Sequence, residues 1–288
     1  AAAIARGGNS IKEISRFLNS EGYSRKNVNL TLKGSLSGWR CNEATLQPKL
    51  KWLRQIGLSH DQVTKAVATS PAILGLSIEQ NLKPTVEWLL DLSLSEAQVA
   101  KAVTAHPAIL GYSIERNLKP TVQWLLDLGL NNTQVSKAVA TCPATLGYSI
   151  ERNLKPTVEW LLNLGLSKSR IAKAVASKPN ILGYSIEQNL KLLDMGLSNS
   201  EVTTAVTCFP SFLGLSIDKN LKPKYSLLLA AFGPTEAGQL VAKCPRILSY
   251  SQQRLTERLS VLAELNQTEK LTSALCLTTP AFEKRFSR

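Results

Sequence analysis

Apolar and polar residues follow one pattern that repeats about every 36 positions along the chain. Residues 84–119 and 120–155 match at 26 of 36 positions without a gap. A period of this length predicts a repeat array, in which each unit buries its apolar face against its neighbours. Other copies lie at 48–83 and 156–191, with a copy at 192–222 that lacks five residues and a degenerate copy at 223–258. One proline marks the register of the copies: Pro71, Pro107, Pro143, Pro179, Pro210, Pro245 and Pro280.

The first segment of each unit predicts a helix that begins at a Lys-Pro pair. In the copy at 84–119 it runs from Pro84 to about Leu92 and is apolar nearly all round. Such a helix must be covered on both sides by neighbours. Its tryptophan equivalents, Trp52, Trp88, Trp124 and Trp160, are therefore expected in the core rather than as stacking platforms for bases. Glycines stand where the helix should stop, at Gly57, Gly129, Gly165 and Gly196.

The second segment predicts another helix, which ends just before the marker proline because the α conformation is disfavoured there. Val99, Ala102 and Val103 form its inward stripe, and Lys101 points outward. The link that follows predicts a short 3₁₀-like turn with Ile109 and Leu110 in the core. Good N-cap residues precede the second helices at Ser59, Ser95, Asn131, Ser167 and Ser198, and Ser113 is a further N-cap in the link. With no alternating strand pattern, the fold class is all-α.

The two ends of the chain differ from the repeats. Ile11, Ile14, Phe17 and Leu18 predict an amphipathic helix, and the polar stretch from Arg25 to Trp39 predicts a loop. We expect residues 1–38 to form this N-terminal helix and loop, 39–258 the tandem repeats, and 259–288 a C-terminal half-repeat cap. The eroded copy at 39–47 would cap the first repeat, as solenoids require.

Composition adds a partner and removes several function classes. The formal net charge is +13, which suits a polyanionic partner, although a charged soluble surface would give the same number. The chain contains no run of 18 apolar residues, so the sequence predicts no membrane span. Five cysteines without a CxxC pair predict buried free thiols in a reducing compartment, not a disulfide framework or zinc site. No phosphate loop, metal cluster or catalytic constellation is present, so we expect neither an enzyme nor a cofactor.

At the repeated motifs the sequence resembles a known family. Units of the form L-K-P-x-V-x-W-L-x-x-L-G-L-S, followed by a helix and P-x-I-L-G-Y-S, are similar to the mitochondrial transcription termination factor (mTERF) family over residues 39 to about 282. The resemblance implies two α-helices and a 3₁₀ turn per unit in a superhelical solenoid. The residues leave its hand open, right or left, and the resemblance favours left.

The resemblance also implies a function. It predicts double-stranded DNA, sometimes RNA, held along a basic concave groove, in a mitochondrion or chloroplast, with a role in transcription, its termination or RNA maturation. We expect a monomer that meets the organelle transcription machinery and no membrane. A protein-binding helical-repeat scaffold and an RNA-binding factor are the alternatives. The near-identity of the units and the missing five residues depart from the family pattern and put sequence-specific termination in doubt.

Three sets of basic residues recur at the repeat period and are the candidate nucleic-acid contacts. Stacked helices would space equivalent residues roughly 9–10 Å apart, or one rung for about three base pairs. Acids at Glu79, Glu115, Glu151, Glu187 and Asp218 are expected to pair with the third set or to serve as first-turn acids. The first lysine ladder is Lys65, Lys101, Lys137 and Lys173, broken at Thr204; the second lysine ladder is Lys83, Lys119, Lys155, Lys191 and Lys222; the arginine set is Arg116, Arg152, Lys219 and Arg254.

Overall fold

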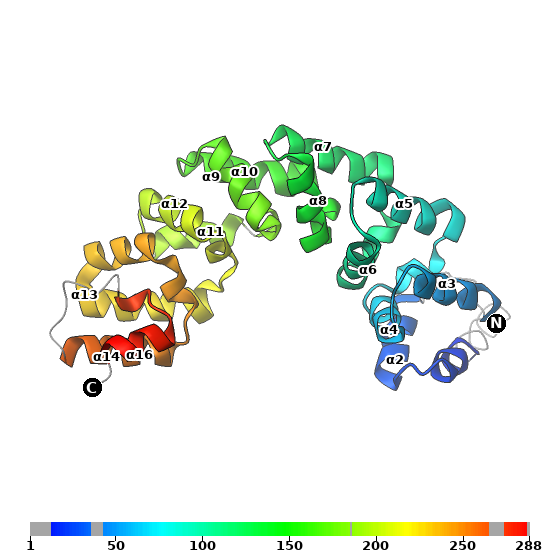
Figure 1. The fold of residues 1–288 in the computed structure, drawn as a ribbon, viewed down its shortest axis with the longest axis horizontal. Helices are drawn as coiled ribbons and strands as arrows, with labels where there is room; N and C mark the ends of the chain where they lie inside the picture. The colour runs from blue at the N-terminus through cyan, green and yellow to red at the C-terminus, as the bar shows by residue number, and fades with distance from the viewer. Residues whose placement is uncertain (1–12, 36–42, 185, 265–273, 287–288) are drawn as a thin grey trace, which may run out of the picture. The chain divides into compact units, whose positions relative to one another are not determined.

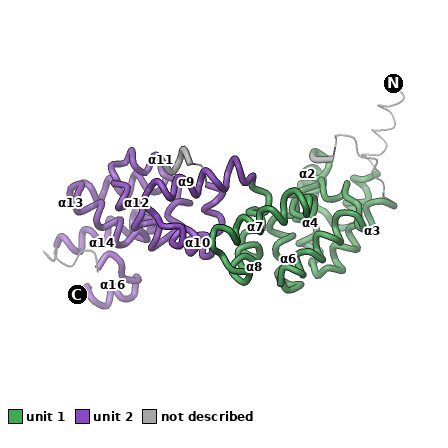
Figure 2. The backbone as a smooth tube through the Cα atoms, turned by 90° about the horizontal axis from the view of Figure 1, so that it is seen from above, with its two compact units in different colours: residues 1–148 green, residues 149–288 purple. Residues whose placement is uncertain are grey.

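All regular structure in the described part of the chain is helical, which confirms the all-α class. The computed structural model describes residues 13–35, 43–184, 186–264 and 274–286. No strand occurs in these ranges (Figure 1). The chain divides into two compact units, Ala1–Tyr148 and Ser149–Arg288 (Figure 2). The predicted order of helix, helix and 3₁₀ turn recurs in both units, and the hand of the superhelix stays a prediction.

The elements of the first unit follow the repeat closely. After a helical segment that ends at Ser20 come α2 (Arg25–Ser35), α3 (Glu43–Gln55), α4 (His60–Thr69), η1 (Pro71–Gly75), η2 (Ile78–Leu82), α5 (Lys83–Asp91), α6 (Glu96–Ala105), η3 (Pro107–Gly111), η4 (Ile114–Leu118), α7 (Lys119–Asp127), α8 (Asn132–Thr141) and η5 (Pro143–Gly147). We call α4, α6 and α8 second helices, as predicted, and α3, α5 and α7 first helices.

The second unit continues the repeat and then degenerates. Its elements are η6 (Ile150–Leu154), α9 (Lys155–Asn163), α10 (Lys168–Ser177), η7 (Pro179–Gly183), α11 (Ile186–Asp194), α12 (Asn199–Cys208), η8 (Pro210–Gly214), η9 (Ile217–Leu221), α13 (Lys222–Lys243), η10 (Pro245–Ser249), α14 (Gln252–Glu264) and α16 (Thr279–Phe286). The long α13 is two helices joined at Gly233, whose φ is 77°. The second helices here are α10 and α12.

The second helices begin, bury and end as predicted. Ser59, Ser95, Asn131 and Ser198 each accept a hydrogen bond from the backbone of the residue three positions on, and that residue's side chain accepts one in return. Ser167 caps α10 without the reciprocal bond. Val99, Ala102 and Val103 are almost fully buried, and so are Ile109 and Leu110 of the 3₁₀ turn. The local chemistry of the sequence therefore sets these elements.

The first helices start earlier than predicted. The Ser113 hydroxyl caps the chain as expected, but the residues after it form a π-helical turn that runs directly into α7. In that turn the Leu118 N–H donates to the Ser113 carbonyl, five residues back. A proline inside an α-helix would collide with the carbonyl four residues before it. The wider π turn accommodates Pro120 within a continuous helix.

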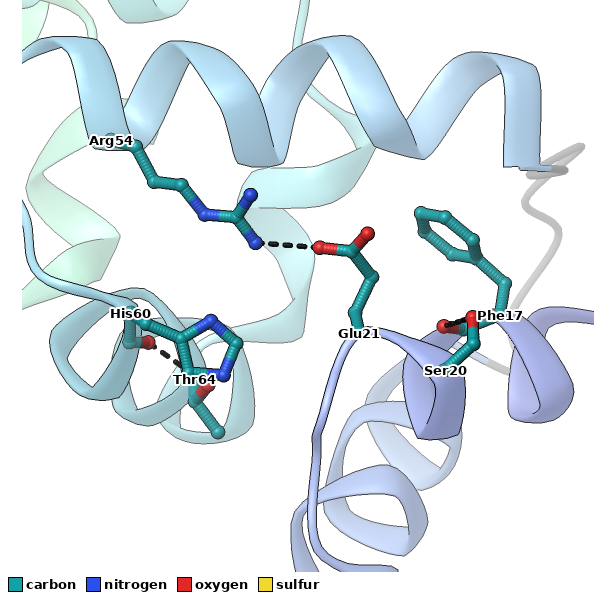
Figure 3. Close-up of polar contacts among 6 residues, drawn as sticks. All are labelled: Phe17, Ser20, Glu21, Arg54, His60 and Thr64. Carbon is teal, nitrogen blue, oxygen red and sulfur yellow. Dashed lines mark hydrogen bonds and ion pairs between the residues drawn. The ribbon is translucent and has the colours of Figure 1, made fainter.

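The predicted loop after Arg25 is wrong where the structure describes it. Residues 25–35 form α2, because Ser24 caps them and Val28 and Thr31 are buried on one face against α4 and η1. Ile14, Phe17 and Leu18 of the preceding helix are buried as predicted, and Ile11 lies outside the described residues. Arg54 of α3 donates to Glu21 at 2.5 Å and ties this segment to the repeats (Figure 3).

This N-terminal segment has the features of a repeat unit. The helix that ends at Ser20 is followed by Gly22, whose φ is 85°, and by the N-cap Ser24, and the second helix, α2, packs on α4. Tyr23 lies edge-on to His60 of the next unit, with ring centroids 6.1 Å apart. The sequence signal was the aligned spacing of Leu18, Gly22, Ser24 and Val28, which match Leu53, Gly57, Ser59 and Val63.

The cysteines do not all remain free, so that prediction is wrong. Cys244 and Cys276 form a disulfide with their Cα atoms 6.2 Å apart. Their separation of 32 residues is not a recognisable spacing, because the fold and not the sequence brings them together. Cys142 is half-buried and Cys208 is exposed, and Cys41 lies outside the described residues. The last marker, Pro280, opens the α-helix α16 instead of a 3₁₀ turn.

Neighbouring units interlock where a side chain of one covers a glycine of the next. A Cβ added to Gly147 would lie 2.3 Å from the Tyr112 hydroxyl, whereas one added to Gly111 would lie 3.4 Å from a Leu76 methyl. His106 Nε2 holds the same tyrosine hydroxyl at 2.7 Å. The same arrangement recurs in the second unit, where a Cβ on Gly214 would lie 2.2 Å from the Tyr184 hydroxyl.

Gly147→Ala should therefore destabilise the protein by about 1–3 kcal/mol, the usual cost of overpacking. The matched change Gly111→Ala should cost clearly less, because a leucine methyl can move aside. Tyr112→Leu should rescue Gly147→Ala, since it recreates the pair of Leu76 and Gly111. Urea denaturation followed by circular dichroism measures all three. Equal losses for the two glycine variants would contradict the interlock.

First helices end in a left-handed residue, and one of these is not glycine. Gly57, Gly129, Gly165 and Gly196 all have φ between 93° and 110°. In the equivalent place of α5 stands Ser93, with φ 67°. The left-handed conformation costs an L-residue about 1–2 kcal/mol, which glycine avoids. Glycine offsets part of this gain, because it loses more conformational entropy on folding than other residues do.

Ser93→Gly should consequently stabilise the protein by about 0.5–1 kcal/mol. The reverse exchange, Gly129→Ser, tests the same term and should destabilise by a similar amount. Thermal unfolding of the two variants beside the parent provides the measurement. If both shifts had the same sign, backbone strain at this position would not be the cause.

Candidate nucleic-acid interface

The first lysine ladder lies on the exposed face of the second helices. Lys65, Lys101, Lys137 and Lys173 are all exposed, each on a helix whose opposite face is buried. Residues four positions to either side share that exposed face and are small or short. These flanking pairs are Asp61 and Thr69, Ala97 and Ala105, Thr133 and Thr141, and Ser169 and Ser177. On α4, α6 and α8 the long ladder lysine thus rises above short residues at these positions, whereas on α10 the exposed Arg170 lies three residues before Lys173.

Within the first unit, the second helices form a closely packed row. α4 packs on α6 and α6 on α8, whereas contacts between successive first helices are sparser. Elements on the inside of a curved stack lie closer together than those on its outside. Figure 1 accordingly shows α4, α6 and α8 along one side of this unit and α3, α5 and α7 along the other. The ladder residues Lys65, Lys101 and Lys137 therefore belong to the inner side of the first unit.

The lysines of the first ladder have no acidic partner among the described residues. None of their ammonium groups forms an ion pair with any described residue. On α2, Lys26 lines one hollow together with Asp61 and Lys65, and Leu30 occupies the position of this segment that corresponds to the ladder lysine. The prediction of a loop at that position hid Lys26 from the sequence analysis.

The second lysine ladder is largely paired. Lys83 Nζ lies 3.7 Å from Glu79 Oε2, Lys119 Nζ lies 2.5 Å from Glu115 Oε1, and Lys155 pairs with Glu151. These acids stand in the first turn of their helices, which confirms one of the two expectations for them. The other expectation, that they pair with the arginine set, is wrong, because a separation of four residues places them on the lysine side.

The second lysine ladder is also irregular in the second unit. Lys191 lies in the last turn of α11 and not at the start of a helix, because five residues are missing and α11 begins at Ile186, where the other units have their π turn. Lys222 does begin α13, but Asp218 forms no ion pair with it among the described side chains. The shorter aspartate stands where the other units carry glutamate.

The arginine set divides in two. Arg116, Arg152 and Lys219 are exposed and form no ion pair in the described ranges. Arg254 is half-buried, and its guanidinium carbon lies 3.8 Å from the Tyr250 ring centroid, where it makes a cation–π contact. Arg254 is therefore engaged by the protein itself.

Two lysines with a structural role, which the sequence analysis did not identify, follow the helix prolines Pro48 and Pro223. Lys224 is 5% exposed and donates to the Leu248 carbonyl at 2.9 Å, and Lys49 donates likewise to the Leu74 carbonyl. Burial lowers the pKa of the Lys224 ammonium. The middle units carry buried threonines in this place, Thr85, Thr121 and Thr157. These two lysines raise the net charge without contributing to an outer surface.

The prediction that the repeat tryptophans lie in the core holds fully for one of the four. Trp160 is buried, and Trp52, Trp88 and Trp124 are half-buried. The described ranges contain no group of three or more His, Cys, Asp or Glu residues that could hold a metal ion. In the same ranges, no helix has the length and apolar character that crossing a membrane requires.

Comparison with known proteins agrees with the repeat architecture. The mTERF family model matches residues 3–192 and 188–283, which together span nearly the whole chain. The protein belongs to the mTERF family. The match begins at residue 3 and so includes the N-terminal segment that has the features of a repeat unit. Among curated proteins, no sequence gives a significant match.

Proposed function

We propose that the protein binds double-stranded DNA along the exposed face of its second helices and regulates organelle transcription or its termination. The observation that carries this proposal is the first lysine ladder, which places one exposed ammonium without an ion pair to any described residue at the same position of four successive repeats. Membership of the mTERF family and the net charge of +13 support it. The exposed Arg116, Arg152 and Lys219 are secondary candidates, and the paired lysines of the second ladder rank below them.

The geometry of the ladder suits a phosphate backbone. Within the first unit α4 packs on α6 and α6 on α8. Packed helices lie about 8–10 Å apart, so Lys65, Lys101 and Lys137 would meet phosphates about three base pairs apart. The short residues that flank each rung let a duplex approach closely, and hydroxyls such as those of Thr133, Ser169 and Ser177 can donate to phosphate oxygens. Contacts of this kind supply affinity rather than sequence recognition. An RNA duplex carries the same charge, and competition between the two duplexes decides between them.

We further propose that the protein acts in a mitochondrion or chloroplast, as a monomer beside the transcription machinery. Fluorescence microscopy of the tagged full-length protein tests the compartment. Size-exclusion chromatography with light scattering tests the monomer. A cytosolic signal or a stable dimer would overturn the respective statement.

The duplex affinity should fall steeply with salt, because lysine–phosphate contacts release counterions. Replacing Lys101, Lys137 and Lys173 together by glutamine should lower the slope of log K against log salt by about 2.7, or 0.9 for each lost phosphate contact. Fluorescence anisotropy with a 30-base-pair labelled duplex between 50 and 300 mM salt measures the slope.

The matched control replaces Lys83, Lys119 and Lys155 by glutamine, which removes the same charge from the paired ladder. Its slope should change much less, because those lysines already neutralise glutamates. Circular dichroism verifies that both triple variants remain folded. A parent protein whose affinity does not depend on salt would refute the proposed function, and equal slopes for the two variants would exonerate the first lysine ladder.

A further inference from the structure

Helix α10 carries far more positive charge than the other second helices. Within their helix bounds, α4 and α6 each contain one lysine and one acidic residue, α8 contains a single lysine, and α12 contains a single glutamate. By contrast, α10 holds Lys168, Arg170 and Lys173 and no acid. The formal charge of the second helices is therefore highest, at +3, on this one element.

Arg170 is the residue that departs most from the repeat. In α4, α6, α8 and α12 its position is held by Gln or Glu, whose side-chain oxygen accepts the N-cap backbone N–H at 2.8–2.9 Å. A guanidinium has no acceptor and cannot make this bond. The Arg170 side chain is exposed and has no hydrogen bond or ion pair to any described residue.

The exchange to arginine has local costs. The reciprocal capping bond is lost, and a cation stands in the first turn of a helix, where the macrodipole disfavours it. Arg170 also lies three residues before Lys173, so two like charges share one helix face. Residues that break local rules without a structural gain are expected where a chain makes contact with a partner.

We propose that Arg170 and Lys173 together grip one phosphate group of the nucleic acid and make α10 the anchor of the interface. This inference rests on the proposed function. A guanidinium binds phosphate through two parallel hydrogen bonds, whereas each other rung offers a single ammonium. The repeat places the two cations on adjacent turns of the same exposed face. The anchor contacts the backbone and is therefore indifferent to base sequence.

Arg170→Gln is a sharp test, because it installs the residue that three sister helices carry. It should weaken binding of a 30-base-pair duplex about tenfold or more, the usual scale of a charge-assisted contact. Lys101→Gln and Lys137→Gln should each weaken it less. The thermal midpoint of Arg170→Gln should stay equal or rise, since the capping bond returns. Arg170→Lys should fall between the parent and Arg170→Gln. The converse change Gln98→Arg should tighten binding by placing a second cation beside Lys101.

The outcomes separate this inference from the proposed function. If the parent binds no duplex at any salt concentration, the proposed function fails first. If it binds but Arg170→Gln weakens binding no more than Lys101→Gln, α10 is not the anchor. Repeating the titration with two duplexes of unrelated sequence tests the contact itself, and a loss confined to one sequence would mean base reading and overturn the phosphate grip.

Discussion

Burial of apolar side chains between successive units holds the array together. Each first helix buries one face against its neighbours and exposes the other: in α5 Leu89 is buried, whereas Glu87 and Leu90 are exposed, so the prediction that neighbours cover this helix on both sides is wrong. Residues such as Leu89, Val103, Ile109 and Leu110 are almost fully buried, because the helices and 3₁₀ turns of neighbouring units close over them. Stability in such arrays is the sum of unit terms and interface terms, so each interface depends on its local fit. The exposed faces of the second helices take no part in this packing and are free to carry charge.

Much of this architecture follows from sequence because the rules involved are local. A serine or asparagine N-cap, a stripe of valine and alanine, and a proline that ends the helix act within ten residues. The π turn at Ser113 was not predictable in this way, since it resolves a conflict between the cap before it and Pro120 after it. The helix α2 was missed because its buried face holds the single valine Val28 and the polar Thr31, whose hydroxyl donates to the Asn27 carbonyl, and such a face leaves no apolar stripe in the sequence. The disulfide of Cys244 with Cys276 depends on long-range folding and leaves no mark on the sequence.

The candidate interface was predictable in outline but not in rank. Periodicity alone identified all three basic sets and treated them as equals. Side-chain partners distinguish them. Lys119 forms an ion pair with Glu115 and Arg254 makes a cation–π contact with Tyr250, whereas Lys101 has no ion pair with any described residue. Partner choice depends on a separation of four residues along a helix and on ring positions in space. The first relation is readable from sequence, and the second is not.

The interlock of Tyr112 with Gly147 has a consequence for how such a chain lengthens. The unit 84–119 carries both parts of the joint: Tyr112 protrudes toward Gly147 of its successor, and Gly111 receives Leu76 of its predecessor. A duplicated unit therefore arrives with both halves of the joint and fits between its parents without any new substitution. Units 84–119 and 120–155, still alike at 26 of 36 positions, are what recent growth by tandem duplication would leave behind. The joint between Leu76 and Gly111 is looser, because a Cβ added there would lie 3.4 Å from a leucine methyl.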